Sequence, residues 1–242
     1  MIHVRRIAPL RRPLLAILGS AVLVAACSGG AATPAPAVPG GPTAPGGSTV
    51  PGGSTAPGSP ASATCPTSQP PALPAGETRT VTIATDKGTF AIRVEADLSP
   101  IAAGNFVALA SCGFYDGVVF HRVVPGFVIQ GGDGQYGREP GVDPARVGTG
   151  GPGYTIRDEP VTATYGRGTV AMARTNAPDS VGSQFFVVLD DGARQALAAY
   201  NTYQIIGTVT SGMEVVDAIA AAADAENPSR PVAMTKVTVS NP

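Results

Sequence analysis

His121 and Arg122 lie side by side in a largely apolar stretch, FHRVVPGFVIQGGD (residues 120–133), and Gln130 follows in the same stretch. The segment is typical of two short strands joined at Pro125-Gly126. Side chains alternate across a strand, so one face of the first strand carries Val118, Phe120, Arg122 and Val124. A guanidinium keeps its proton and is costly to bury without a partner. Arg122 is therefore predicted either to form a structural ion pair or to be held in place for use.

A purely structural role for Arg122 requires an acid, and the nearest acids in sequence, Asp116 and Asp133, both lie beside glycines in predicted turns. His121 is the only histidine outside the N-terminal segment, and no cluster of Cys, His or carboxylates surrounds it in sequence. This pattern favours a buried, hydrogen-bonded histidine over a metal ligand, and no metal site is expected. Ser183 lies in GSQF rather than in a G-x-S-x-G elbow, so no nucleophile is evident.

The stretch GTGGPG (148–153) matches the G-x-G-x-x-G pattern of dinucleotide sites letter for letter. That site needs a strand before the glycines and a helix after them. Here Pro152 stands where the helix would begin, so the stretch is interpreted as a glycine-rich surface loop.

Short strands dominate the elements that must position these residues. Alternation and turn signals predict strands at 80–85, 88–94, 118–124, 127–131, 168–173, 184–189, 204–209 and 234–240. A helix is predicted from an N-cap at Ser99 to Gly113, and a second over 213–223. Many short strands with two helices favour a barrel or sandwich over a doubly wound parallel sheet.

The first 26 residues have the pattern of an export signal. Four arginines precede an apolar run, residues 14–26, that is too short to cross a bilayer as a helix. The run ends in LVAAC (23–27), which resembles the lipobox of bacterial lipoproteins, in which the cysteine is lipid-modified and becomes the new N-terminus. We therefore expect a lipoprotein signal peptide over residues 1–26 and a lipid on Cys27. An ordinary secretory signal with an incidental cysteine is the alternative.

Residues 27–76 are predicted to form a disordered tether, and the folded domain is predicted over 77–242. Residues 28–76 hold 12 of the 24 prolines and no charged or aromatic residue, which leaves too little apolar area to offset the entropy of ordering.

Without residues 1–26 the chain has 12 basic and 17 acidic residues, a net charge of −5, which argues against a nucleic-acid partner. Cys65 and Cys112 are predicted to form a disulfide, as is usual for a pair of cysteines in an exported protein, with two free thiols as the alternative.

Several segments together resemble the cyclophilin-type peptidyl-prolyl isomerases. FHRVVPGFVIQGGD is similar to the signature of that family. NFVALA before it, and GTGGPGY, GTVAMA, GSQFFV and GMEVVDAIA after it, occur in the order of the family, over about residues 79–240. The resemblance implies a mainly β fold, an eight-stranded antiparallel closed β-barrel capped by two α-helices.

The resemblance also implies roles for individual residues. Arg122 would be the catalytic residue, which donates hydrogen bonds to the proline amide of the substrate, and Gln130 would help to orient it. The remaining substrate-binding positions would be Phe127, Val128, Gly148, Ala173, Arg174, Gln184, Phe186 and Tyr203. Neither a cofactor nor a metal is implied. Departures from the family pattern are Val128 in place of methionine, Tyr203 in place of histidine, and the absence of any tryptophan. Residues 190–202 align poorly with the family, and Leu197 is the residue of this segment that would line the pocket.

The function predicted from these features is a prolyl isomerase that assists the folding of exported proteins at the outer face of the cytoplasmic membrane of a bacterium. X-Pro segments of unfolded proteins would be its partners, the lipid on Cys27 its contact with the membrane, and the protein would be a monomer. A non-catalytic module that binds proline-containing segments is the alternative. A solute-capturing lipoprotein fits less well, because such proteins are usually larger and two-lobed.

Overall fold

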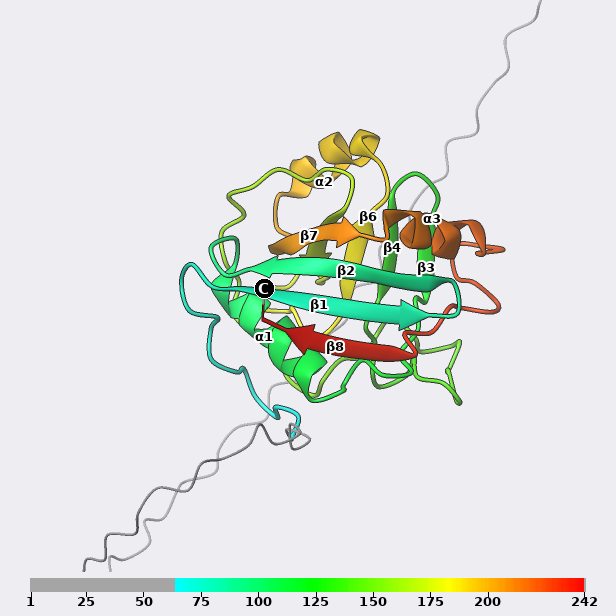
Figure 1. Ribbon diagram of the computed structural model, residues 1–242, viewed down its shortest axis with the longest axis horizontal. Coiled ribbons are helices and arrows are strands. Elements are labelled where there is room, and N and C mark those ends of the chain that lie inside the picture. The colour runs from blue at the N-terminus through cyan, green and yellow to red at the C-terminus, as the bar shows by residue number, and fades with distance from the viewer. Residues whose placement is uncertain (1–63, 242) are drawn as a thin grey trace, which may run out of the picture. The chain divides into compact units, whose positions relative to one another are not determined.

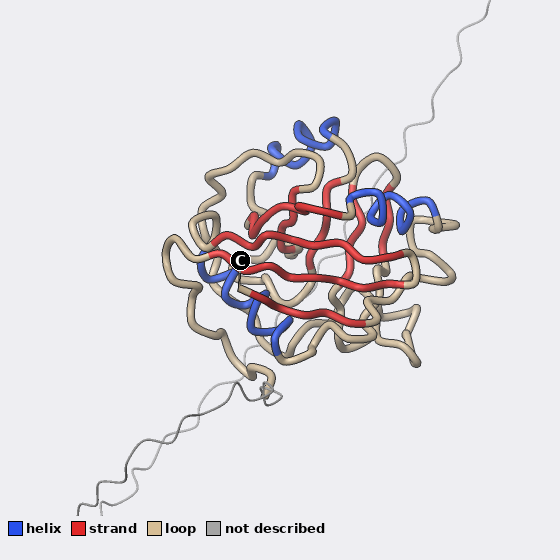
Figure 2. The backbone as a smooth tube through the Cα atoms, viewed as in Figure 1, coloured by secondary structure: helices blue, strands red, loops and turns tan. Residues whose placement is uncertain are grey.

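The computed structural model of the chain describes residues 64–241 (Figure 1). The predicted signal peptide, Cys27 and the tether up to residue 63 lie outside the described residues. The strands are β1 (Thr78–Thr85), β2 (Gly88–Glu95), β3 (Arg122–Val124), β4 (Val128–Gly131), β5 (Thr169–Met172), β6 (Phe185–Val188), β7 (Ile205–Ser211) and β8 (Lys236–Ser240). The helices are α1 (Pro100–Ser111), α2 (Arg194–Tyr200) and α3 (Met213–Ala221), with a 3₁₀ turn at Asp191–Ala193. Long loops separate several of these elements (Figure 2). No helix within residues 64–241 is long and apolar enough to span a membrane.

The eight strands form one antiparallel sheet in the order β3-β4-β6-β5-β7-β2-β1-β8. Figure 1 shows β7, β2, β1 and β8 in this order, with α1 packed against β8 and α3 against β2. The predicted closed barrel is wrong, because the edge strands β3 and β8 do not pair with each other. β3 has only three residues, and the backbone N–H of its middle residue, Val123, donates to the carbonyl of Glu226 in the loop before β8 (2.7 Å).

Irregular backbone contacts, rather than a ladder, connect the two edges of the sheet. Val119 forms an isolated bridge with Ala233, and Gly117 N–H donates to the Met234 carbonyl (2.7 Å). These residues precede β3 and β8, so the predicted strand over 118–124 is ordered as strand only at its end. The sheet is therefore an open half-barrel.

The sheet between β3 and β7 is covered by apolar side chains on both faces. The register sets Val123, Ile129, Val187 and Val170 opposite one another in one row, and all four belong to the main core. The neighbouring row contains Arg122, Gln130, Phe186, Ala171 and Ile205. Because paired residues in adjacent strands share a face, the second row lies on the opposite side of the sheet from the main core.

A second apolar cluster covers that opposite side. Its buried members are Val128, Tyr165, Ala171, Phe186, Val188, Ala193, Leu197 and Ile205, and we call it the outer-face cluster. Leu197 comes from α2, a helix that was not predicted and that lies within the poorly aligned segment 190–202. The burial of Leu197 (3% exposed) explains why this segment is ordered: its one apolar face packs on the sheet.

The N-terminus of α1 is capped differently from the prediction. Ser99 makes no side-chain bond to the helix, and its hydroxyl donates to the Leu98 carbonyl. Instead the carboxylate of Glu159 accepts hydrogen bonds from the N–H groups of Ile101 (2.8 Å) and Ala102 (2.9 Å). A carboxylate here also offsets the positive end of the helix dipole, so a residue from a distant loop fixes the start of α1.

Residues 65–76, which we call the strap, lie along α1, and the prediction that all of residues 27–76 are a disordered tether is therefore wrong for this part. Cys65 is joined to Cys112 by a disulfide, and the Leu73 N–H donates to the Pro100 carbonyl (2.9 Å). Leu73 is buried at 7% exposure, so the strap contributes an apolar side chain to the core, which the proline-rich composition of the segment did not indicate. Gly104 of α1 allows this approach, because a Cβ there would lie 2.4 Å from the Pro71 carbonyl oxygen.

Candidate functional site

The outer face of the sheet brings the predicted catalytic residue close to predicted substrate-binding residues. Arg122 pairs in register with Gln130, and Gln130 pairs with Phe186, so the three side chains form one row across β3, β4 and β6. Phe186 and Val128 are buried in the outer-face cluster, and Phe127, Ala173 and Tyr203 pack against it half-buried. The arrangement is an apolar floor with a guanidinium at one edge.

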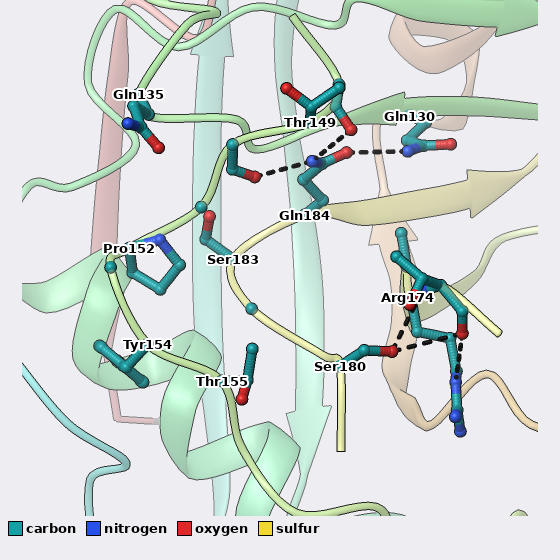
Figure 3. A pocket seen from close by; sticks show the side chains of 17 residues that line it. Gln130, Gln135, Thr149, Pro152, Tyr154, Thr155, Arg174, Ser180, Ser183 and Gln184 are labelled. Carbon is teal, nitrogen blue, oxygen red and sulfur yellow. Dashed lines mark hydrogen bonds between the residues drawn. The ribbon is translucent and has the colours of Figure 1, made fainter. Parts of the chain in front are cut away.

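A cavity of about 620 Å³ lies beside this row and is lined by the remaining predicted residues, Gly148, Ala173, Arg174 and Gln184. Gln130 also lines it and therefore links the cavity to the outer-face cluster. The other walls come from residues 149–155 and from Ser180, Gly182 and Ser183 (Figure 3). We call this space the glycine-loop cavity. GTGGPG thus forms a wall of the cavity, with no helix after it, as the sequence predicted.

Gln184 is the centre of a hydrogen-bond network at the rim of the cavity. Its Nε2 donates to the carbonyls of Gly148 and Gly150 (both 2.9 Å), and its Oε1 accepts from Nε2 of Gln130 (3.0 Å) (Figure 3). The Gln130 amide is therefore held by Gln184. Within residues 64–241 no hydrogen bond joins Gln130 to Arg122, so the orienting role that the resemblance implied for Gln130 has no direct contact behind it.

Asp133 holds the same glycine loop from the other side. Its fully buried carboxylate accepts four backbone N–H groups: Gln135 (3.0 Å) and Tyr136 (3.0 Å) at Oδ1, Gly148 (2.8 Å) and Gly150 (2.9 Å) at Oδ2. Four charge-assisted bonds satisfy a buried carboxylate and make it a rigid bracket. The sequence analysis did not assign this role, because two of the four donors come from a loop 15 and 17 residues further along the chain.

Arg122 forms an ion pair with a residue that the sequence analysis did not consider. Its Nε donates to Oε1 of Glu226 at 2.7 Å, and the two side chains are 36% and 58% exposed. The two acids weighed from the sequence are engaged elsewhere: Asp133 as described above, and Asp116 with the Val237 N–H (2.8 Å) and Lys236 (2.7 Å). No local pattern could have revealed Glu226, which is 104 residues from Arg122.

His121 is buried, as predicted, at 5% exposure; the Val119 backbone and the Gln184 side chain lie near its ring, but neither forms the predicted hydrogen bond with normal geometry. Neither ring nitrogen has a partner within the described residues. Burial lowers the pKa of His121 from its ordinary value of 6.5, and the negative charge of Asp133 opposes this shift. Gly148 lies over the imidazole, since a Cβ at that glycine would be 3.4 Å from Cδ2 and Nε2 of His121. Among residues 64–241 no group of three or more Cys, His, Asp or Glu is placed to hold a metal.

Arg174 and Tyr203 have structural contacts at the site. The Arg174 guanidinium turns away from the cavity (Figure 3), donating to the carbonyls of Thr175 and Ala177 and pairing with Asp158 at 3.0 Å. The Tyr203 ring packs edge-on against Phe186, with 5.4 Å between centroids.

Tyr165 fixes Tyr203 by donating its hydroxyl to the Tyr203 carbonyl (2.9 Å), and burial raises the pKa of Tyr165 to about 12. The N–H of Ala173 already donates to the Gln184 carbonyl (2.8 Å), so only the carbonyl of Ala173 is left for a bound peptide.

Comparison with known proteins places this chain in a family. Residues 80–239 match the family model described as cyclophilin type peptidyl-prolyl cis-trans isomerase/CLD. The chain is 41% identical over 150 residues to a probable peptidyl-prolyl cis-trans isomerase of Brucella abortus, covering 61% of this chain and 74% of that protein. It is 41% identical over 128 residues to peptidyl-prolyl cis-trans isomerase B of Bacillus subtilis, covering 50% and 79%.

Two solved structures have the same fold. The crystal structure of a cyclophilin type peptidyl-prolyl cis-trans isomerase of Cryptosporidium parvum superposes with a TM-score of 0.57 at 28% identity, covering 68% of this chain and 99% of that one. A structure of the same protein in the presence of the dipeptide Ala-Pro gives a TM-score of 0.56 at 27% identity, covering 67% and 99%. Because residues 80–239, more than half of this chain, match the family model, the chain belongs to the cyclophilin-type peptidyl-prolyl cis-trans isomerases.

Proposed function

We propose that Arg122 is the catalytic residue and that the outer-face cluster binds the proline ring of the substrate. The observation that carries this assignment is the register of β3, β4 and β6, which puts Arg122 in one row with Gln130 and Phe186 on the face opposite the main core. A proline seated on Phe186 and Phe127 would have its amide nitrogen at the polar edge of that floor. The solved relative in the presence of Ala-Pro supports a proline-containing ligand.

The chemistry follows from the barrier to amide rotation. The X-Pro bond resists rotation by about 20 kcal/mol, because resonance gives the C–N bond partial double-bond character. Rotation removes that resonance and returns a lone pair to the nitrogen, which becomes a better hydrogen-bond acceptor. A guanidinium fixed beside the nitrogen stabilises the twisted state more than either planar state, and this difference is what accelerates the reaction.

Replacement of Arg122 tests the assignment. Arg122→Ala should lower kcat/KM for an X-Pro peptide by about one to three decades, roughly 1.4–4 kcal/mol, with little change in Tm. Arg122→Lys should not restore the rate, because an ammonium lacks the planar fork of donors. An NMR exchange assay on the peptide gives the rate. If Arg122→Ala turns over at the wild-type rate, or is unfolded by circular dichroism, then Arg122 is a structural residue and the assignment is wrong.

We further propose that the enzyme works outside the cytoplasm as a monomer, tethered to the membrane through a lipid on Cys27, and assists the folding of exported proteins. The Cys65–Cys112 disulfide supports this location, because disulfides persist in oxidising compartments and are rare in the cytosol. The basic and apolar residues before Cys27 support export and anchoring.

Cell fractionation tests the location. The wild-type protein should partition with membranes and carry an acyl-modified Cys27 by mass spectrometry, whereas Cys27→Ala should lose the lipid. A wild-type protein that is soluble and unmodified would refute the anchor. Light scattering on the unlipidated protein tests the monomer, and a stable dimer would contradict it.

A further inference from the structure

Glu226 holds β3 by two separate contacts. Its backbone carbonyl accepts the N–H of Val123 (2.7 Å), and its side chain accepts Nε–H of Arg122 (2.7 Å). The first contact fixes the Cα of Glu226 beside the edge of β3, whatever its side chain is. The carboxylate is thereby delivered to the guanidinium from an anchored backbone, which lowers the entropy cost of forming the pair.

The contact is made at one nitrogen only. Within residues 64–241 Arg122 makes no hydrogen bond through its terminal Nη1 or Nη2. A carboxylate that held both terminal nitrogens would compete with the substrate for them. A carboxylate on Nε instead restrains the plane of the guanidinium and leaves the terminal N–H groups to donate.

The neighbouring amide does not perform this task. Gln130 lies opposite Arg122 in the register, but its Nε2 is bonded to Gln184 (3.0 Å). Arg122 therefore has one side-chain partner in the described part of the chain, and that partner comes from the loop between α3 and β8.

We propose that Glu226 is a positioning residue for the isomerase reaction, which aims the Arg122 guanidinium by binding its Nε and leaves the terminal nitrogens for the substrate. This inference rests on the proposed catalytic role of Arg122. The sequence left two roles open for Arg122, a structural ion pair or a functional donor. In this proposal the two roles are combined, because the ion pair with Glu226 orients the guanidinium that donates to the substrate.

Three substitutions separate charge from hydrogen bonding. Glu226→Ala removes both, whereas Glu226→Gln retains an oxygen that can accept Nε–H. Both leave the Val123 contact in place, because it uses the backbone. Ser229→Ala is the matched control: it removes the Ser229 hydroxyl bond to Asp224 in the same loop and touches neither Arg122 nor Glu226.

The assay is kcat/KM for an X-Pro peptide with the full chain at low salt, about 0.05 M. Glu226→Ala should lower it about two- to five-fold, the size expected for an exposed pair, through kcat rather than KM. Glu226→Gln should fall between Glu226→Ala and wild type, and Ser229→Ala should match wild type. Raising salt to about 0.5 M should bring the wild type towards Glu226→Ala, because an exposed pair is screened, and should change Glu226→Ala little.

The double variant Arg122→Ala/Glu226→Ala distinguishes this inference from the one on which it rests. If Glu226 acts only through Arg122, the double variant should have the same kcat/KM as Arg122→Ala alone. A Glu226→Ala enzyme at or above the wild-type rate, or an equal loss in both backgrounds, would overturn the positioning role while Arg122→Ala remains slow. An active Arg122→Ala enzyme would instead overturn the catalytic role itself.

Discussion

Asp133→Asn should destabilise the protein more than any exposed Asp→Asn change, although it alters only one side-chain atom. The fully buried carboxylate accepts two backbone N–H groups at each oxygen. In asparagine one of these oxygens becomes an NH₂ group, which donates. Whichever way the amide turns, two backbone N–H groups lose their acceptor and face a donor.

The cost can be worked out from these contacts. A buried donor left without a partner costs about 1–3 kcal/mol, so two of them give about 2–6 kcal/mol. This is a large part of the 5–15 kcal/mol by which domains are usually stable. For a domain of this size each kcal/mol lowers Tm by about 2–4 °C, so a fall of roughly 5–20 °C is expected.

Urea denaturation followed by circular dichroism measures the effect. Asp86→Asn is the control, because the Asp86 side chain lies 62% exposed in the turn between β1 and β2 and should leave the midpoint unchanged. Activity provides a second readout: if the amide nitrogen faces Gly148 and Gly150, the glycine loop is released and KM should rise at temperatures where the variant is folded. A midpoint equal to that of Asp86→Asn would refute the four-bond bracket.

Three further predictions concern the fold around the site. Burial lowers the pKa of His121, so the folded state disfavours its proton: unfolding free energy should fall as pH drops below about 6.5, and His121→Gln should flatten this slope in denaturation series between pH 7.5 and 5. Cys65→Ser should lower the free energy of unfolding by up to about 4 kcal/mol, the chain-entropy value for a separation of 47 residues; thiols that alkylate without reductant in the wild type would contradict this. Gly104→Ala should destabilise by about 1–3 kcal/mol in the same denaturation assay despite the better helix propensity of alanine, because its Cβ would collide with the Pro71 carbonyl; an unchanged or higher midpoint would show that the strap is not held there.

Local patterns were sufficient to predict most elements of the fold. Within the described residues seven strands occur where the patterns indicated them, and β3 covers only the end of the strand predicted over 118–124; helices occur at Pro100–Ser111 and Met213–Ala221. These elements are specified by periodicity over a few residues. The errors occur where distant segments meet: the edges of the sheet, the cap of α1 by Glu159, and the strap, whose anchor Leu73 is one apolar residue in a proline-rich segment. α2 was missed because seven residues give too short a pattern to recognise.

The candidate site divides in the same way. The resemblance assigns Arg122, Gln130 and Phe186 to motifs, and the strand register places them in one row; their roles in the site stay a prediction. Asp133 and Glu226 could not be assigned their contacts, because a carboxylate in a sequence does not indicate which backbone or guanidinium will reach it after folding.

Strand β6 has no residue that faces water. Phe185 and Val187 are buried in the main core, while Phe186 and Val188 are buried in the outer-face cluster. A polar replacement at any of the four sites would therefore damage either the main core or the outer-face cluster. Insertions that leave the sheet untouched are expected instead in the loops around it, residues 134–155 and 190–204.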